Sequence, residues 1–224
     1  MPGIREHFGS REGGGPAFGP EFAPERSLSR MHADAAECER CDLYRNATQV
    51  VFGEGPRDAE VMLVGEQPGD REDLAGRPFV GPAGRLLDEC LQEAGLDRSQ
   101  LYLTNAVKHF KFQQRGKRRL HAKPNAGEIQ RCAWWLGGEL ALIRPKLVVA
   151  LGATAVYALL GTRVRVMQSR GAILPAPDGF SILVTVHPSS LLRNPDRSRA
   201  AEQRRQFVDD LAKIESFLES AGRH

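Results

Sequence analysis

The chain of 224 residues is long enough for one domain with a sizeable core. Hydrophobic residues make up 41% of it and charged residues 26%, as is ordinary for a soluble globular protein. No apolar run approaches the roughly 20 residues that cross a bilayer, and the N-terminus lacks the apolar core of a secretory signal, so we expect a cytoplasmic protein without membrane contact. The net charge of +3 is too small for a global field, so an anionic partner must be bound by a local basic patch.

Residues 1–30 are rich in Gly, Pro and charge without apolar periodicity, and they predict a flexible tail. We expect one domain over residues 31–224, beginning with a short helix from His32 to Tyr44. This helix is expected to carry a C-x₂-C pair, Cys38 and Cys41. Four cysteines without an export signal favour metal binding or redox use over a disulfide scaffold.

Buried strands are predicted to alternate with helices through the rest of the domain. The predicted strands are apolar runs at residues 61–64, 101–107, 146–151 and 182–186. The predicted helices have apolar residues at helical spacing and cover residues 82–94, 125–143, 153–160 and 199–218. This alternation predicts an α/β fold, a three-layer α/β/α sandwich with a central, mainly parallel four-stranded sheet.

Polar residues stand at the carboxyl ends of three predicted strands. They are Glu66, Asn105 and His187. Ligands bind beyond these ends in parallel sheets, so we expect the three side chains to converge on one crevice. The polar, basic segment from Lys108 to Lys123 is too long and too charged for an ordinary connection between elements.

Four motifs resemble those of the uracil-DNA glycosylase superfamily, in the right order along residues 30–215. They are GEQPG at 65–69, GRPFVG at 76–81, TNAVK at 104–108 and HPSSL at 187–191. They match best the iron–sulfur branch and its UdgX-type subgroup, whose members become covalently attached to the site they create. The resemblance implies that superfamily's fold and a substrate of uracil-containing DNA, single- or double-stranded. We expect a monomer, the default for a one-domain repair enzyme.

The resemblance also implies a 4Fe–4S cluster, held by Cys38, Cys41, His109 and Cys132. Related iron–sulfur glycosylases have a cysteine where this chain has His109, and an imidazole can ligate iron. If His109 is only a surface residue, three thiolates and an external ligand could hold the cluster, and a Cys₃His zinc site is chemically plausible too. We interpret Cys90, on an apolar helix face, as a packing thiol. The cluster's expected role is to fasten the N-terminal helix to the domain.

Uracil excision breaks the C1′–N1 bond, so a catalyst must hold the flipped base and stabilise its anion. By resemblance, Phe79 stacks on uracil, although it could instead be a core residue. Asn105 reads N3–H and O4 with its amide, which offers a donor and an acceptor. His187 hydrogen-bonds O2 of the departing base.

Two further segments border this expected pocket. In the first turn, Gly69 permits close approach of backbone amides to the base or a phosphate, and Asp70 tunes the turn. The second loop is expected to enter the duplex with an apolar wedge at Leu191 or Leu192, either of which could instead be core. The remaining residues assigned to substrate or DNA contact in these two segments are Gln67, Ser189, Ser190 and Arg193.

The basic segment decides the expected mechanism. Its run of Lys117, Arg118 and Arg119 could simply be a solvated loop that touches phosphates. However, Lys-Arg-Arg-Leu-His resembles the UdgX-type signature, whose histidine captures the sugar, and this assigns capture to His121. A positioned imidazole nitrogen is a better nucleophile than water, and its bond to C1′ has a poor leaving group. By the same resemblance, Glu66 accepts a hydrogen bond or a proton from the other ring nitrogen.

Other functions compete with covalent capture. One is a multiple-turnover uracil-DNA glycosylase whose basic loop only grips DNA. Another is a non-catalytic, cluster-bearing protein that binds damaged DNA. A generic nucleotide-binding enzyme is disfavoured because neither a G-x-G-x-x-G after the first strand nor a P-loop is present.

Overall fold

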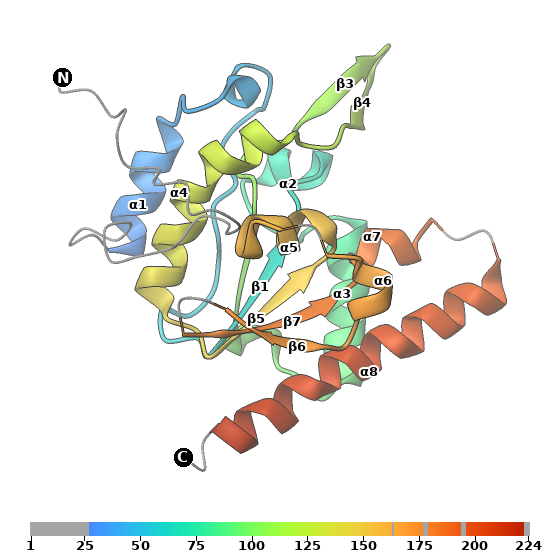
Figure 1. Cartoon of the computed structure of the whole chain (residues 1–224). Coiled ribbons are helices and arrows are strands. Elements are labelled where there is room, and N and C mark those ends of the chain that lie inside the picture. Colours follow the sequence, from blue (N-terminus) through green and yellow to red (C-terminus); the bar gives the residue numbers. More distant parts are fainter. Residues whose placement is uncertain (1–26, 163, 177–178, 194–195, 222–224) are drawn as a thin grey trace.

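A sheet of five strands lies at the centre of the computed structural model, which describes residues 27–162, 164–176, 179–193 and 196–221 (Figure 1). Its strand order is β2-β1-β5-β7-β6. The four neighbours from β2 to β7 pair in parallel, and β6 pairs antiparallel with β7. The strands are β1 (Val61–Gly65), β2 (Leu101–Asn105), β5 (Leu147–Leu151), β6 (Ile173–Pro175) and β7 (Ser181–Thr185).

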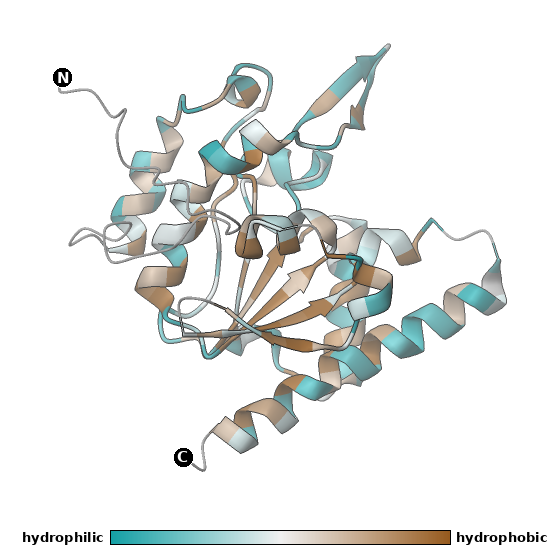
Figure 2. Cartoon of the chain, viewed as in Figure 1, coloured by the Kyte–Doolittle hydropathy of each residue, from teal (hydrophilic) through white to brown (hydrophobic). Residues whose placement is uncertain are grey.

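Helices cover both faces of this sheet, because successive side chains of each strand point to opposite faces. In β1, Met62 and Val64 join the core beneath α1 (Leu28–Ala36), α4 (Ala126–Ile143) and α5 (Ala153–Leu160). Val61 and Leu63 join the other core, beneath α3 (Pro82–Glu93), α7 (Pro188–Leu191) and α8 (Arg197–Ala221). The brown strands between partly teal helices in Figure 2 show the same layering.

The predicted α/β/α sandwich with a mainly parallel sheet is confirmed, but the sheet has five strands instead of four. The additional strand, β6, is only three residues long and pairs with β7 at the edge of the sheet. None of its residues is buried, so it carries little apolar pattern. The described residues also form two short helices, α2 (Asp70–Ala75) and α6 (Val166–Ser169), and two 3₁₀ turns, η2 (Asp42–Arg45) and η3 (Arg98–Gln100). No described helix is long and apolar enough to cross a bilayer.

The N-terminal region differs from the prediction in its boundaries. Residues 1–26 of the expected tail lie outside the described residues, whereas residues 28–30 already belong to α1, which Ser27 caps by accepting from the amide of Arg30. Helix α1 ends at Ala36, so Cys38 and Cys41 lie in the segment after it and not on a helix to Tyr44. The expected helix was therefore wrong for the C-x₂-C pair.

The basic segment forms a β-hairpin that projects from the body of the molecule (Figure 1). Strands β3 (Phe112–Arg115) and β4 (Arg118–His121) pair antiparallel, with Phe112 opposite His121, and Gly116 at φ 58° makes the turn. Because neither strand has a buried apolar face, the sequence lacks the alternation that predicts strands. The strand predicted over residues 101–107 is also shorter than expected, since β2 ends at Asn105 and not at Val107.

Candidate active site

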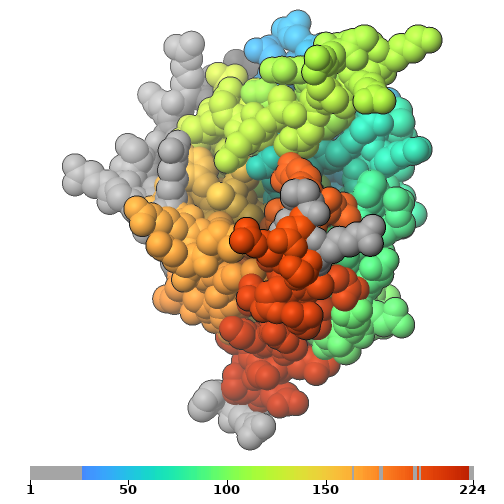
Figure 3. Space-filling model, turned by 90° about the vertical axis from the view of Figure 1, so that its right-hand side faces the viewer, coloured from blue at the N-terminus to red at the C-terminus, as the bar shows by residue number. Residues whose placement is uncertain are grey.

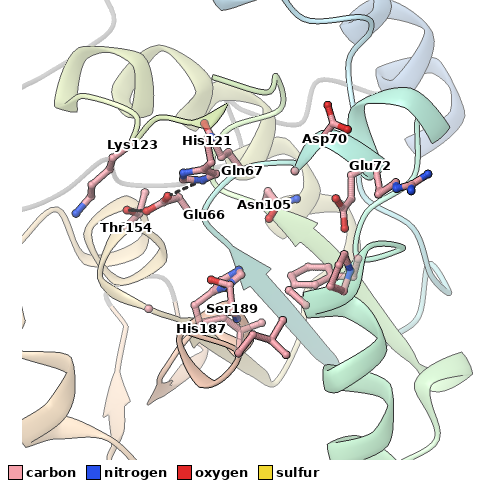
Figure 4. A pocket seen from close by; sticks show the side chains of 18 of the residues that line it. Glu66, Gln67, Asp70, Glu72, Asn105, His121, Lys123, Thr154, His187 and Ser189 are labelled. Atoms are coloured by element: carbon pink, nitrogen blue, oxygen red, sulfur yellow. Dashed lines mark hydrogen bonds and ion pairs between the residues drawn. The ribbon is translucent and has the colours of Figure 1, made fainter. Parts of the chain in front are cut away.

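A cleft of about 630 Å³ opens at the carboxyl ends of the parallel strands (Figure 4). Glu66 follows β1, Asn105 ends β2 and His187 follows β7, and all three line this cleft. Their predicted convergence is confirmed. The hairpin contributes His121 to the same lining, so a segment outside the sheet completes the wall.

Asn105 and Phe79 form one buried side of the cleft. Their side chains can approach each other across Gly65, because a Cβ at that position would overlap Oδ1 of Asn105. Asn105 is 3% exposed, and the Phe79 ring lies near-parallel to that of His187, with centroids 6.2 Å apart. Phe79 belongs to a hydrophobic core cluster and also lines the cleft, so it is a core residue, and its stacking on uracil stays a prediction. An aromatic ring and an amide thus line the same side of the cleft.

His187 is held in one neutral form. The backbone amide of Ser189 donates to its Nδ1 at 3.2 Å, so Nδ1 is an acceptor and the ring proton is on Nε2. Burial lowers the pKa of His187 to about 4, despite the nearby charge of Glu66, which raises it. His187 therefore presents a neutral N–H donor near neutral pH, which suits stabilisation of a developing negative charge.

Glu66 contacts His121 directly. Oε1 of Glu66 lies 3.2 Å from Nε2 of His121, and Oε2 accepts a hydrogen bond from the hydroxyl of Thr154 in α5 (Figure 4). Burial raises the pKa of Glu66, but the hydrogen bonds from His121 and Thr154 outweigh it and the net pKa is lowered. The carboxylate is thus ionised near neutral pH and orients the imidazole of His121, leaving the other ring nitrogen free of this contact.

The side chain of Gln67 holds the two ends of the hairpin segment together, a role that its sequence position did not reveal. Its Nε2 donates to the carbonyls of Lys111 and Ala122 at 3.0 and 3.2 Å, and its Oε1 accepts from the amide of Lys111. Gln67 also lines the cleft, and the expected approach of the backbone amides of this turn to a base or a phosphate stays a prediction. The two residues after β1 act together, because Glu66 holds the His121 ring and Gln67 holds the strands that carry it.

Arg119 was expected to face DNA phosphates, and that prediction is wrong for its guanidinium. Its Nε and Nη1 bind Asp70 and Asp73 of α2 at 2.6 Å each, and the group lies over the ring of Phe112. Its side chain is only 17% exposed. Asp70, expected to tune the turn, serves instead as an anchor for the hairpin. Arg118 and Lys117 remain exposed at the hairpin's outer end, where a phosphate can reach them.

The loop after β7 separates its two leucines. Leu191 is 6% exposed in the core with Phe207, so its expected role as a wedge is wrong. Leu192 is 51% exposed and lines the cleft, as does the exposed Arg193. The two serines stabilise the loop, since Ser189 contacts Nδ1 of His187 and the hydroxyl of Ser190 donates to the carbonyl of His187.

The hairpin, the α2 segment and the α7 segment border one face of the molecule (Figure 3). Residues of all three regions line the cleft. Exposed cations of the hairpin and of the α7 loop thus lie on the face with the cleft, where an anionic ligand can reach them.

Two buried polar residues that sequence reasoning missed support the cleft. Glu72 of α2 is 8% exposed, and its Oε1 accepts from the amide of Gly81 at 2.8 Å, which fixes the loop that carries Phe79. A Cβ at Gly69 would lie 2.8 Å from the same carboxylate, so this turn requires a small residue for packing. Thr154 could have been suspected from its position in the first turn of a helix after a buried strand, whereas Glu72 has no local signal.

Three cysteines and His109 occupy the region between α1 and α4. Sγ of Cys38 accepts from the indole of Trp135 at 3.1 Å, and Sγ of Cys132 accepts from the amide of Lys108 at 3.2 Å. Burial raises the pKa of Cys132 to about 12, and the neighbouring Cys41 and Cys38 contribute to this increase. Such mutually repelling thiols are deprotonated together only when a positive centre binds them.

This donor set fits an iron–sulfur cluster. Burial lowers the pKa of His109, which keeps the imidazole neutral as a ligand must be, and His109 and Cys38 line the same small pocket. Among the described residues, no group of three His, Cys, Asp or Glu side chains is arranged to hold a single metal ion. In a cluster each ligand binds a different iron atom, so the ligands stand farther apart. The buried Cys90 lies on the other face of the sheet and packs there.

Comparison with known proteins adds independent findings. The model of a family described as the uracil DNA glycosylase superfamily matches residues 52–212. A type-4 uracil-DNA glycosylase of Thermotoga maritima is 39% identical over 202 residues, covering 90% of this chain and 100% of the relative. A type-4 enzyme of Pyrobaculum aerophilum is 34% identical, with 83% and 91% covered, and a type-5 uracil-DNA glycosylase of the same organism is 31% identical, with 64% and 67% covered.

Proposed function

The chain belongs to the uracil DNA glycosylase superfamily, and on that premise we propose that it excises uracil from DNA and joins C1′ of the resulting abasic sugar to His121. The observation that carries the second half is the 3.2 Å contact between Glu66 and His121 in the wall of the cleft. The contact supports the proposal, because an imidazole lies beside an ionised carboxylate in the wall of the cleft.

Excision begins with the base held in the cleft. Uracil stacks on Phe79, and the amide of Asn105 contacts N3–H and O4. As the C1′–N1 bond breaks, its electron pair leaves with N1, and negative charge spreads to O2 of the base. The Nε2–H of His187 donates to that oxygen and stabilises the anion, as preorganised donors do in other enzymes.

Capture follows at the electron-poor C1′. The ring nitrogen of His121 that does not face Glu66 donates its lone pair to C1′ and forms the new C–N bond. The proton on the nitrogen facing Glu66 passes to the carboxylate and then to solvent, while the uracil anion takes up a proton. The product imidazole is neutral and a poor leaving group, so the bond persists and each molecule acts once.

The cysteine-rich region is proposed to hold a 4Fe–4S cluster through Cys38, Cys41, Cys132 and His109. When bound, the cluster supplies a cross-link between the segment after α1 and helix α4, and excision and capture are carried out by residues of the cleft. About four iron atoms per chain with negligible zinc is the expected metal content, and stoichiometric zinc would contradict this assignment.

The alternative of a multiple-turnover enzyme is tested by His121→Ala. We expect wild-type protein to form a complex with a uracil-containing oligonucleotide that survives a denaturing gel, and we expect none from His121→Ala, which still releases uracil with water as nucleophile. Glu66→Gln should form the complex more slowly. Leu120→Ala is the matched control, because this exposed neighbour has its side chain on the other face of β4.

The same experiment needs a control substrate and has a clear contrary result. An oligonucleotide with thymine in place of uracil should give neither free base nor complex. A denaturant-resistant complex with His121→Ala would contradict the assignment of the nucleophile. Uracil release by wild type without any complex would favour multiple turnover, and binding without release would favour the non-catalytic alternative.

A further inference from the structure

Lys108 and Glu139 form an ion pair that is fully enclosed by the protein. Nζ of Lys108 lies 2.6 Å from Oε2 of Glu139, and both side chains are 0% exposed. Removing two charges from water costs free energy that their attraction offsets only partly, so apolar side chains would stabilise the fold as well here. The pair does not line the cleft, and none of the steps described above uses it. Its contacts suggest another role.

The ammonium of Lys108 has three acceptors, one for each of its protons. Besides Glu139, these are Oγ1 of Thr104 at 2.6 Å and the main-chain carbonyl of Asn105 at 2.8 Å. Glu139 is fixed in turn, because its Oε1 accepts from the hydroxyl of Tyr102 at 3.1 Å. Tyr102, Thr104 and Asn105 all belong to β2, so this buried network is built around the strand that ends at the base-reading residue.

The carbonyl of Asn105 needs such a partner because β2 is the edge strand of the sheet. Carbonyls on its outer side cannot bond to another strand. Two residues earlier, the outward carbonyl of Leu103 accepts from the amide of Glu54 at 2.9 Å. At Asn105 the ammonium of Lys108 donates to the outward carbonyl instead. On the inner side, the chain beyond Asn105 stays tied to the end of β1, since the amide of Ala106 donates to the carbonyl of Gly65 at 2.9 Å.

We propose that Lys108 is the positioning residue of the base reader, fixing the main chain of Asn105 from the outer edge of β2. This inference rests on the proposed excision of uracil, in which the Asn105 amide contacts the base. An amide that must meet two atoms of uracil at once tolerates little displacement, and a shift of about 1 Å can cost a reaction about 100-fold. Loss of the ammonium removes the charged donor that holds the Asn105 carbonyl.

The test is Lys108→Met, which keeps the length of the side chain and removes its charge. Uracil release is measured with protein in excess, so that the maximal rate and the half-saturating protein concentration are obtained separately. Inhibition by free uracil reports on the base site without DNA. We expect the maximal rate and the affinity for free uracil each to fall about 10- to 100-fold. The half-saturating concentration should not change, because the exposed cations that contact DNA are untouched.

Arg170→Met is the matched control. Arg170 pairs with Asp210, which also accepts from the hydroxyl of Thr185, and the two charged side chains are 12% and 8% exposed. This pair resembles that of Lys108 in kind, but it lines neither the cleft nor the cysteine region. Both variants should lower the melting temperature, whereas only Lys108→Met should impair uracil binding. Iron content should be unchanged in both, since the amide of Lys108 that donates to Cys132 belongs to the main chain.

The outcomes separate this proposal from that of the preceding section. A Lys108→Met protein that keeps the wild-type rate and uracil affinity, or loses no more of them than Arg170→Met, overturns the positioning role. If the single variant does not fold, Lys108→Met/Glu139→Gln removes both charges while Gln keeps the acceptor for Tyr102, and the same criteria apply to it. A wild-type protein that releases no uracil overturns both proposals, whereas the two results above overturn this one alone.

Discussion

The ends of the sheet strands and the hairpin both contribute residues to the cleft, but these residues are held in position in different ways. Asn105 ends a strand of the central sheet and is 3% exposed, whereas His121 ends a hairpin strand and is 47% exposed. The first is fixed by backbone pairing and core packing. The second depends on a few side chains, Glu66, Gln67 and Arg119, that tie the hairpin to the body. Under the proposed function, base recognition thus belongs to the core, and capture belongs to an appendage.

This difference teaches that the two activities can be separated. A change in the core should disturb both, because the base must be held before the sugar can be captured. A change in the hairpin or its anchors should disturb capture and spare excision. The following predictions test that separation, from the largest expected effect to the smallest.

Asn105→Ala should abolish both activities together. The variant loses the only side chain of the cleft assigned to both N3–H and O4, and loss of one well-placed donor in an active site costs about 10²–10³ in rate. Uracil release and complex formation should therefore fall by at least this factor. Both are measured on the same uracil-containing oligonucleotide. Loss of capture with normal release would contradict the assignment of Asn105 to the base.

Arg119→Ala should slow capture about tenfold and leave uracil release near the wild-type rate. The guanidinium bonds to Asp70 and to the fully buried Asp73, and a charge-assisted hydrogen bond contributes about 1.5–3 kcal/mol. Arg118→Ala is the control, because its neighbouring side chain is exposed. Rates of complex formation and of uracil release are compared by quenched time courses. Equal effects of the two substitutions would show that Arg119 does not anchor the nucleophile.

Leu192→Ala should reduce uracil release from double-stranded DNA a few-fold and spare release from single strands. An exposed apolar side chain at the cleft can fill the gap left in a stack, and a single strand has no stack to open. Leu191→Ala should instead destabilise the fold by about 2–5 kcal/mol, as buried leucines do. The melting temperature and the ratio of uracil release from double-stranded and single-stranded DNA distinguish the two variants. A strand-dependent effect of Leu191→Ala without destabilisation would reverse the two roles.

Uracil release should change less than twofold between about pH 5 and pH 8. The pKa of His187 is about 4 and that of Glu66 is lowered from 4.5, so neither group changes protonation in this range. The unfolded chain takes up a proton at His187 near its ordinary pKa of 6.5, so the free energy of unfolding should decrease as pH falls from 6.5 towards 4. This decrease should be smaller in His187→Gln. A release profile with an inflection near pH 6.5 that His187→Gln removes would contradict the neutral imidazole.

The core of this site could be predicted from the sequence, but its appendage could not. Continuous apolar runs predict buried strands, and residues at their ends must meet at one edge, which is why Glu66, Asn105 and His187 were found together. The hairpin has no buried face, so its strands left no periodic signal. Whether Arg118 or Arg119 faces solvent depends on α2, a contact that joins residues far apart in the chain. Likewise, adjacent leucines at 191 and 192 differ only in the direction that the α7 turn gives them.

The central claim is that His121 itself becomes bonded to C1′, and peptide mass spectrometry tests it most directly. After reaction with a uracil-containing oligonucleotide and digestion of both protein and DNA, trypsin should release residues 120–131, because Lys123 precedes a proline. We predict that this peptide carries the mass of the attached deoxyribose remnant and that fragmentation places it on His121. An adduct on another residue, or unmodified peptide from the isolated complex, would contradict the account.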